Sequence, residues 1–319
     1  MTRTEVAEWL KNNDRYLIVT HRRPDGDTLA SAAALALGLK ALGKTACLFP
    51  NPETTERFRY LVDRLHAPLG YAWDYVITVD TASEDMFPLG SGNLSGQTDL
   101  AIEHHPSHSG YAPRVYVDAD CAACGEIIYA LLLDMGVSLT PDIAEALYVA
   151  IATDTGCFCY SNTTAITHRI AAALMETGID AGEINRLLFR SKTRPRVLLE
   201  GLILSSLEFY FDSAVCFVTI TQSMLSGTGA TDNDTEDIAS IASGIDGVRV
   251  GITIREVEDG TCKISVRTTP DVSANDICAH FGGGGHATAA GCTIKAPVEE
   301  ARRRLLDVIP RHLPWKETR

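Results

Sequence analysis

A short segment near the amino terminus combines one imidazole with two carboxylates. It reads His21-Arg-Arg-Pro-Asp25-Gly-Asp27. One histidine with several carboxylates gives a mixed nitrogen and oxygen donor set, which suits Mn²⁺ or Mg²⁺, with Zn²⁺ or Co²⁺ as further candidates. Pro-Asp-Gly is also a common turn sequence, so the segment taken alone is equally compatible with a surface turn. Its meaning depends on what the rest of the chain brings near it.

Three later segments end in residues of the same kind. An apolar run over residues 75–79 ends in Asp80, and a second run ends in Glu103-His104-His105. A third apolar stretch, starting at residue 147, runs into Asp154. Each has an ordinary explanation as a capped strand, a hydrogen-bonded histidine pair or a helix terminus. Four such termini in one chain predict a shared metal site, because the carboxyl ends of parallel strands meet at one edge of a sheet.

The elements that would position these residues alternate along the first half of the chain. Strands are expected at residues 16–20, 45–49, 75–79, 100–102 and 115–117, and helices at 28–42, 125–133 and 143–151. Strands separated by crossover helices are typical of an α/β fold with a mostly parallel sheet flanked by helices.

The second half has a different pattern of expected helices and strands. Residues 162–207 have a helical pattern, followed by expected strands at 214–219, 248–254 and 262–266 and an expected helix over 234–241. We therefore expect an amino-terminal domain over residues 1–188, a helical linker over 189–207, and a smaller mixed α+β domain over 208–319. A length of 319 residues fits two domains of ordinary size.

Composition narrows the classes of function. The 28 basic and 41 acidic side chains give a net charge of −13, which argues against a protein that grips long nucleic acid. The longest apolar run, residues 29–39, is about half of a membrane span, and no signal peptide is visible at the start. The nine cysteines are therefore expected to be reduced thiols in a cytoplasmic protein without metal-binding roles.

A glycine run stands out in the second half. Gly282 to Gly285 are followed by His286, and Arg267 lies upstream. The run lacks the Gly-Lys-Ser/Thr ending of a Walker loop, and it could be a plain flexible turn. With a helix of small residues expected after His286, its backbone N–H groups could instead contact a phosphate, and Arg267 could grip it with two hydrogen bonds.

Taken in order, these motifs resemble the DHH phosphoesterase family. The motifs are His-x-x-Pro-Asp-x-Asp, the strand-terminal Asp80, the histidine pair and Asp154-Thr-Gly. The segment from Phe281 to Gly291, preceded by Ser265-Val-Arg267, resembles the DHH-associated carboxyl-terminal domain. Within the family, the chain is most similar to small bacterial oligoribonucleases that also dephosphorylate 3′-phosphoadenosine 5′-phosphate (pAp).

The resemblance implies a centre with two divalent ions, Mn²⁺ being the expected metal and Mg²⁺ or Co²⁺ the alternatives. His21 and Asp25 would hold one ion, Asp80 would bridge, and the second ion would be held by Asp27, His104 and Asp154. His105 would face the phosphate as a catalytic group, beside the bridging Asp80. Substrate binding is expected from the second domain, through the residues Arg267, Gly283, Gly284, Gly285 and His286, across a cleft between the domains.

One position departs from the family pattern. Glu103 stands where the family name has Asp, which lengthens the arm of a supporting carboxylate and is expected to retune activity. Hydrolysis of linear or cyclic dinucleotides is the nearest alternative reaction. A nucleotide-binding module with catalysis weakened at Glu103 is the alternative of another class. We expect a short nucleotide as the partner, and neither long nucleic acid nor a membrane. The sequence is also compatible with a homodimer.

Overall fold

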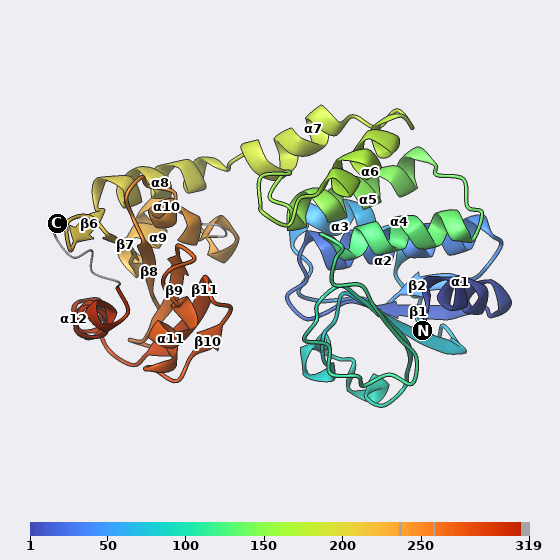
Figure 1. Ribbon diagram of the computed structural model, residues 1–319, viewed down its shortest axis with the longest axis horizontal. Helices are drawn as coiled ribbons and strands as arrows, with labels where there is room; N and C mark the ends of the chain where they lie inside the picture. Colours follow the sequence, from blue (N-terminus) through green and yellow to red (C-terminus); the bar gives the residue numbers. More distant parts are fainter. Residues whose placement is uncertain (236–237, 258, 314–319) are drawn as a thin grey trace. The chain divides into compact units, whose positions relative to one another are not determined.

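The structure is a computed structural model, which describes residues 1–235, 238–257 and 259–313 (Figure 1). The chain divides into two compact units, Met1–Ser191 and Lys192–Arg319. Each unit has its own sheet and its own apolar core. In the ranges that the structure describes, no helix is long and apolar enough to cross a membrane.

The first unit alternates strands with helices. Its strands are β1 (Tyr16–Val19), β2 (Ala46–Leu48), β3 (Tyr75–Val79), β4 (Thr98–Glu103) and β5 (Val115–Val117). Its helices are α1 (Arg3–Asn12), α2 (Gly26–Ala41), α3 (Glu56–Val62), α4 (Cys124–Asp134), α5 (Pro141–Asp154), α6 (Ala165–Met175) and α7 (Ala181–Asn185). The strands pair in the order β2-β1-β3-β4-β5, and each neighbouring pair is parallel. Their carboxyl ends therefore share one edge.

Helix α2 is the structural centre of this unit. The side chains of β1 alternate between two apolar clusters, so that Tyr16 and Ile18 join the helical core while Leu17 and Val19 join a smaller one. Helix α2 packs on the sheet and also against α4 and α5 (Figure 1). Its alanine-rich sequence permits this, because small side chains allow neighbouring elements to approach closely. The contact between α2 and α5 brings the first turn of one helix beside the last turn of the other.

The second unit has a mixed sheet. Its strands are β6 (Glu208–Tyr210), β7 (Val215–Ile220), β8 (Val250–Glu256), β9 (Cys262–Thr268), β10 (Gly284–Gly285) and β11 (Ala289–Ile294). Its helices are α8 (Arg194–Ser205), α9 (Gln222–Thr228), α10 (Ala239–Ser243), α11 (Ala274–Ala279) and α12 (Val298–Val308). The order is β10-β11-β9-β8-β7-β6, in which β7 and β8 are parallel and the other pairs antiparallel. The predicted fold class, a parallel α/β domain followed by a mixed α+β domain, is confirmed.

Two helices predicted in the second half fall on segments that the structure describes differently or only in part. The helix predicted after His286 is wrong, because Ala289–Ile294 is strand β11 and pairs with β9. Its small residues let the glycine run lie against the strand. The predicted helix over 234–241 includes residues 236–237, which lie outside the described residues, and Asp232–Thr235 before them is a 3-10 turn. Within the predicted linker, helix α8 buries Leu199 and Ile203 in the second unit.

Candidate metal centre

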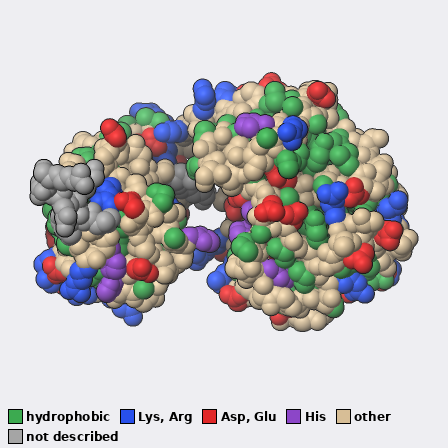
Figure 2. Space-filling model, viewed as in Figure 1, with side chains coloured by type: hydrophobic (Ala, Val, Ile, Leu, Met, Phe, Trp, Pro, Cys, Tyr) green, Lys and Arg blue, Asp and Glu red, His purple; other side chains and the backbone are tan. Residues whose placement is uncertain are grey.

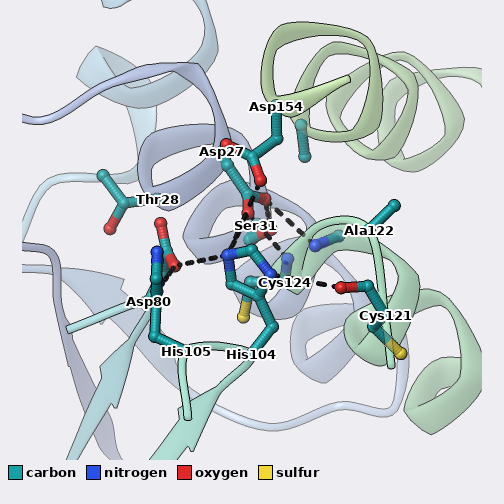
Figure 3. A network of polar contacts seen from close by, with 12 residues as sticks. Asp27, Thr28, Ser31, Asp80, His104, His105, Cys121, Ala122, Cys124 and Asp154 are labelled. Atoms are coloured by element: carbon teal, nitrogen blue, oxygen red, sulfur yellow. Dashed lines mark hydrogen bonds and ion pairs between the residues drawn. The ribbon is translucent and has the colours of Figure 1, made fainter. Parts of the chain in front are cut away.

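The polar segments predicted from the sequence meet at the carboxyl edge of the first sheet. Their side chains come from the ends of strands and helices, namely His21 after β1, Asp25 and Asp27 at the start of α2, Asp80 after β3, His104 and His105 after β4, and Asp154 at the end of α5. Figure 3 shows Asp27, Asp80, His104 and Asp154 turned towards one another. The structure thus brings together all the residues of the first unit that the sequence analysis selected.

One group contains His21, Asp25 and Asp80, whose candidate ligand atoms all lie within 4.8 Å of one another. Nε2 of His21 is 3.7 Å from Oδ1 of Asp25 and 3.9 Å from Oδ2 of Asp80. Nδ1 of His21 lies 2.8 Å from the backbone oxygen of Arg22. In the neutral ring this contact assigns the proton to Nδ1 and leaves the Nε2 lone pair facing the carboxylates, as metal-binding histidines require.

A second group contains Asp27, His104 and Asp154, again with ligand atoms within 4.8 Å of one another. Nε2 of His104 is 3.8 Å from Oδ2 of Asp27 and 3.6 Å from Oδ2 of Asp154. Nδ1 of His104 faces the backbone oxygen of Cys121 at 3.3 Å. Both histidines are therefore oriented in the same way, with a backbone carbonyl behind the ring and carboxylates in front.

Asp80 connects the two groups. Its Oδ2 atom faces His21, while its Oδ1 atom lies 3.5 Å from Nε2 of His104. The residue has a left-handed backbone with φ of 54°, an unusual conformation that costs about 1–3 kcal/mol for a non-glycine residue. Its N–H donates to the carbonyl of Ile102 on β4 at 2.9 Å, which helps to hold this conformation.

The donor atoms of the centre fit a cation. Oδ1 of Asp80 and Nε2 of His104 are both buried, and neither takes part in a hydrogen bond. Two buried lone-pair atoms that face each other without a hydrogen bond between them are unfavourable, because each has lost its water. A divalent ion between them would restore a partner to both. The mixture of histidine nitrogen and carboxylate oxygen is a suitable donor set for Mn²⁺ or Mg²⁺.

Electrostatics support the same interpretation. Burial, with the nearby charges of Asp80 and Asp154, raises the pKa of Asp27 well above its ordinary value. Burial also raises the pKa of Asp80 and, to about 6, that of Asp154. In the absence of metal, these crowded carboxylates hold protons more tightly than free ones do. The centre is therefore short of positive charge, which bound cations would supply.

His105 differs from the two candidate ligand histidines because a carboxylate lies behind its ring. Glu103 is 1% exposed, and its Oε2 atom accepts the backbone N–H of His105 at 2.6 Å and lies 3.0 Å from Nδ1. The carboxylates of Asp80, 3.4 Å from Nδ1, and of Glu103 raise the pKa of His105 to about 11. Burial alone would raise the pKa of Glu103, but the hydrogen bonds and charge of His105 together with His104 lower it. The structure thus pairs a protonated His105 with an ionised Glu103.

Asp27 is held by residues that the sequence analysis did not select. The backbone N–H groups of Cys124 and Gly125, in the first turn of α4, donate to its carboxylate at 2.6 and 3.0 Å. The hydroxyl of Ser31 donates to Oδ1 at 2.8 Å. The N-terminus of a helix carries partial positive charge, so α4 stabilises the ionised form of Asp27. Ser31 follows Asp27 by one helical turn, and that spacing was a visible signal.

Asn51 is a further missed residue. It is buried, and its side-chain amide donates to the hydroxyl of Thr20 and, at 2.9 Å, to the carbonyl of His21. It therefore fixes the backbone that carries the His21 ring. Asn51 follows β2 at the same sheet edge as the other polar residues, so its position was a signal as well.

Comparison with known proteins identifies the family. A model of the DHH family, N-terminal domain, matches residues 15–151, and a model of the DHHA1 domain matches residues 213–313. The bifunctional oligoribonuclease and PAP phosphatase NrnA of Thermus thermophilus is 31% identical over 97% of this chain and 93% of that protein. The chain belongs to the DHH family. The resemblance predicted from the motifs is therefore confirmed, and with it the predicted enzyme class, a hydrolase.

One further relative is similar to this DHH protein in sequence, and two solved structures have a similar fold. The protein of the same name from Bacillus subtilis is 28% identical over 96% of this chain and 97% of that protein. The exopolyphosphatase-related protein of Bacteroides fragilis has a similar fold, with a TM-score of 0.84, 23% identity, and coverage of 97% of this chain and 95% of that one. The exonuclease RecJ bound to manganese shares the fold at a TM-score of 0.54 and 16% identity, over 98% of this chain and 95% of that one.

The DHHA1 unit contains the residues predicted to bind substrate. Arg267 is the penultimate residue of β9 and is half-buried, and its Nη1 donates to the carbonyl of Val266 at 3.2 Å. His286 is exposed after β10. Gly283, Gly284 and Gly285 lie between α11 and β11, and the last two form β10.

The amides of the glycine run are largely occupied within the DHHA1 unit. Gly282 and Gly283 donate to carbonyls of α11, at Ala279 and Cys278, at 3.1 and 3.0 Å. Gly285 donates to Oδ1 of Asn275 at 3.1 Å, and His286 donates to Ala289. These four amides have acceptors within the unit, and binding of a phosphate by the run stays a prediction. The missing side chains instead allow close backbone contact, since a Cβ at Gly283 would lie 2.2 Å from the carbonyl oxygen of Gly291.

Proposed function

We propose that this protein is a two-metal phosphoesterase that hydrolyses short oligoribonucleotides, dephosphorylates pAp, or does both. The observation that carries the proposal is the position of Asp80, whose two carboxylate oxygens face His21 on one side and His104 on the other. The names of the Thermus thermophilus and Bacillus subtilis relatives support the choice of substrates.

In this proposal His21 and Asp25 hold one ion, and the second is held by Asp27, His104 and Asp154, with Asp80 shared. Mn²⁺ is the preferred metal, with Mg²⁺ and Co²⁺ as alternatives, because histidine and carboxylate together suit such ions. Two ions at such a centre would polarise the phosphoryl group and activate water for attack. The residues of the chain set the positions of those ions.

His105 acts as the general acid in the proposed reaction. Its Nδ1 atom is held by Glu103, which leaves Nε2 free to give a proton to the leaving oxygen. Its side chain is 42% exposed, so a substrate can reach it. Glu103 lies buried behind the ring of His105 and orients it. A protein that only binds nucleotides would not need an oriented proton donor. We therefore favour an enzyme over a nucleotide-binding module.

The DHHA1 unit would contribute substrate binding through side chains. Arg267 offers a guanidinium that can form paired hydrogen bonds with a phosphate, and His286 offers an exposed imidazole. The role proposed for Gly283, Gly284 and Gly285 is to hold these neighbours close to β11, because most of the amides there already have acceptors.

The test is release of phosphate or mononucleotide from pAp, a ladder of short RNAs and linear diadenylate, with Mn²⁺ and with chelator. We expect Mn²⁺-dependent turnover of pAp and the shortest RNAs, and its loss in Asp80→Asn. Linear diadenylate is included because dinucleotide hydrolysis uses the same centre, and faster turnover of it than of pAp would reassign the substrate. If the metal-loaded protein binds these nucleotides but hydrolyses none of them, the proposal that it is an enzyme is refuted.

A further inference from the structure

The chain makes an unusual turn directly after Asp154. Gly156, Cys157 and Phe158 are consecutive and all left-handed, with φ values of 55°, 56° and 64°. Residues other than glycine rarely adopt this conformation, and two in succession need support from the surrounding structure. The surrounding residues must therefore stabilise this turn.

Thr155 is the anchor of the turn. It is fully buried, its carbonyl accepts the N–H of Tyr160 at 3.0 Å, and its hydroxyl accepts the N–H of Phe158 at 3.1 Å. The N–H of Cys157 donates to the carbonyl of Ala152 at 2.7 Å. The ring of Phe158 stacks on His168, with centroids 5.5 Å apart. Backbone and side chains together fix the turn as one rigid piece.

The rigid turn displays the ring of Tyr160. A Cβ placed at Gly156 would lie 2.4 to 2.6 Å from three atoms of that ring, so Tyr160 rests directly on the backbone of Gly156. Tyr160 as a whole residue is nevertheless 61% exposed. Among the described residues its hydroxyl has no hydrogen-bond partner. One side of the Tyr160 ring thus packs on the backbone of Gly156, while much of the residue is accessible to solvent.

The turn is tied to the metal centre on both sides. The side-chain amide of Asn162 donates to the carbonyl of Asp154 at 3.1 Å and to that of Ala122 at 3.0 Å. Ala122 follows Cys121, whose carbonyl faces the ring of His104. The segment that carries Tyr160 is therefore fixed to Asp154, the last residue of α5, and to the loop before α4, in which the carbonyl of Cys121 faces His104.

We propose that Tyr160 is a stacking platform for the nucleobase next to the phosphate that is cleaved. The inference rests on the proposed function, since it concerns how a nucleotide substrate is held at that centre. Stacking on an aromatic ring accepts any base, because every base has a π face, so it suits an enzyme that degrades short RNAs of mixed sequence. It would also select nucleotides over base-free sugar phosphates.

The experiment compares substrates with and without a base in four proteins with Mn²⁺ bound. These are the wild type, Tyr160→Ala, Tyr160→Phe and Tyr60→Ala, where Tyr60 is a control tyrosine of the same unit that is 50% exposed. The substrates are pAp and the base-free ribose 3,5-bisphosphate. We expect Tyr160→Ala to raise KM for pAp about 5- to 100-fold with little change in kcat, the effect of losing one stacked base. KM for the base-free compound should not change.

The controls separate stacking from other roles. Tyr160→Phe and Tyr60→Ala should behave as the wild type does. Equal losses on both substrates in Tyr160→Ala would indicate a structural role and overturn the inference. So would a loss in Tyr160→Phe as large as that in Tyr160→Ala, since the hydroxyl would then be the active group, or no loss in either variant.

A binding measurement keeps this inference separate from the proposed reaction. The Kd values of AMP and ribose 5-phosphate are measured by calorimetry with the Mn²⁺-loaded proteins. Tyr160→Ala should weaken AMP binding by the same factor and leave ribose 5-phosphate unchanged. If the wild type hydrolyses neither pAp nor RNA but this difference is present, the proposed function fails and the platform stands. If pAp is hydrolysed but the difference is absent, the platform fails alone.

Discussion

Glu103 and His105 contact each other twice, through the backbone N–H of His105 at 2.6 Å and through its Nδ1 atom at 3.0 Å from Oε2 of Glu103. The longer side chain at the position where the family name has Asp thus still reaches the histidine that it would have to orient. Oε2 of Glu103 contacts both the backbone and the ring, and Oε1 also lies 3.2 Å from Nδ1, which leaves Nε2 of His105 to act on the substrate.

The first prediction concerns this pair. Glu103→Ala should lower kcat for pAp about 10- to 100-fold, the usual effect of removing a residue that orients a ligand or catalytic group. Glu103→Gln should fall between Ala and the wild type, because it keeps an acceptor but loses the charge. Steady-state kinetics with saturating Mn²⁺ give kcat and KM separately. An Ala variant with unchanged kcat would show that Glu103 does not orient His105.

The second prediction concerns metal content. The wild type should bind about two Mn²⁺ ions per chain, and His21→Ala and His104→Ala about one each, because each removes a ligand from a different group. Asp80→Asn should weaken both sites because its two oxygens serve both. Equilibrium dialysis followed by elemental analysis measures the content. His66→Ala, outside the centre, is the matched control, and a single ion in the wild type would contradict the prediction.

The third prediction concerns pH. Burial and neighbouring charges raise the pKa of Asp154 to about 6 and also raise that of Asp27, so the folded state binds protons more tightly than the unfolded chain. Burial alone would lower the pKa of His21, but its contacts with Asp25, the backbone of Arg22 and Asp80 together raise this pKa from 6.5 to about 9. Such groups stabilise the fold at low pH, and the contribution is lost as pH rises through each folded pKa.

The melting temperature of the metal-free protein should therefore fall between about pH 5.5 and about pH 8. Mn²⁺ should stabilise the protein more at the higher pH, because the ligands must lose their protons to bind it. Thermal unfolding with chelator and with Mn²⁺ at both pH values measures this. A metal-free protein that melts higher at the alkaline pH would contradict the assignment of raised pKa values to this centre.

The fourth prediction concerns the glycine run. Gly283→Ala would bring a Cβ to 2.2 Å from the carbonyl oxygen of Gly291, which belongs to the backbone of β11 and cannot simply turn aside. We expect a loss of about 1–3 kcal/mol in the free energy of unfolding, the usual cost of forcing atoms into a packed site. Urea unfolding followed by circular dichroism measures the change.

Gly201→Ala is the matched control for that substitution. Gly201 lies in helix α8, and a Cβ there meets nothing within 4 Å. Alanine should therefore stabilise the helix by about 0.5–1 kcal/mol. If Gly283→Ala is as stable as Gly201→Ala, the close contact between the glycine run and β11 is not a constraint on this protein.

Much of the candidate centre could be predicted from local patterns. Apolar runs that alternate with helical segments predict a parallel sheet, and a parallel sheet puts all strand ends on one edge. His21, Asp80 and His104 could therefore be selected as neighbours without any distance being known. The same logic applies to Asn51, which follows the end of β2.

Other features are decided only by the tertiary structure. The carboxylate of Asp27 is held by the N–H groups of Cys124 and Gly125, which are almost a hundred residues away along the chain. No local pattern could reveal this, because the partners depend on how α2 and α4 pack. The glycine sequence suggests free amides, whereas folding directs the amides of three glycines and of His286 to acceptors in α11 and β11. A sequence shows which groups need partners, but only the packing of distant segments determines which partners they find.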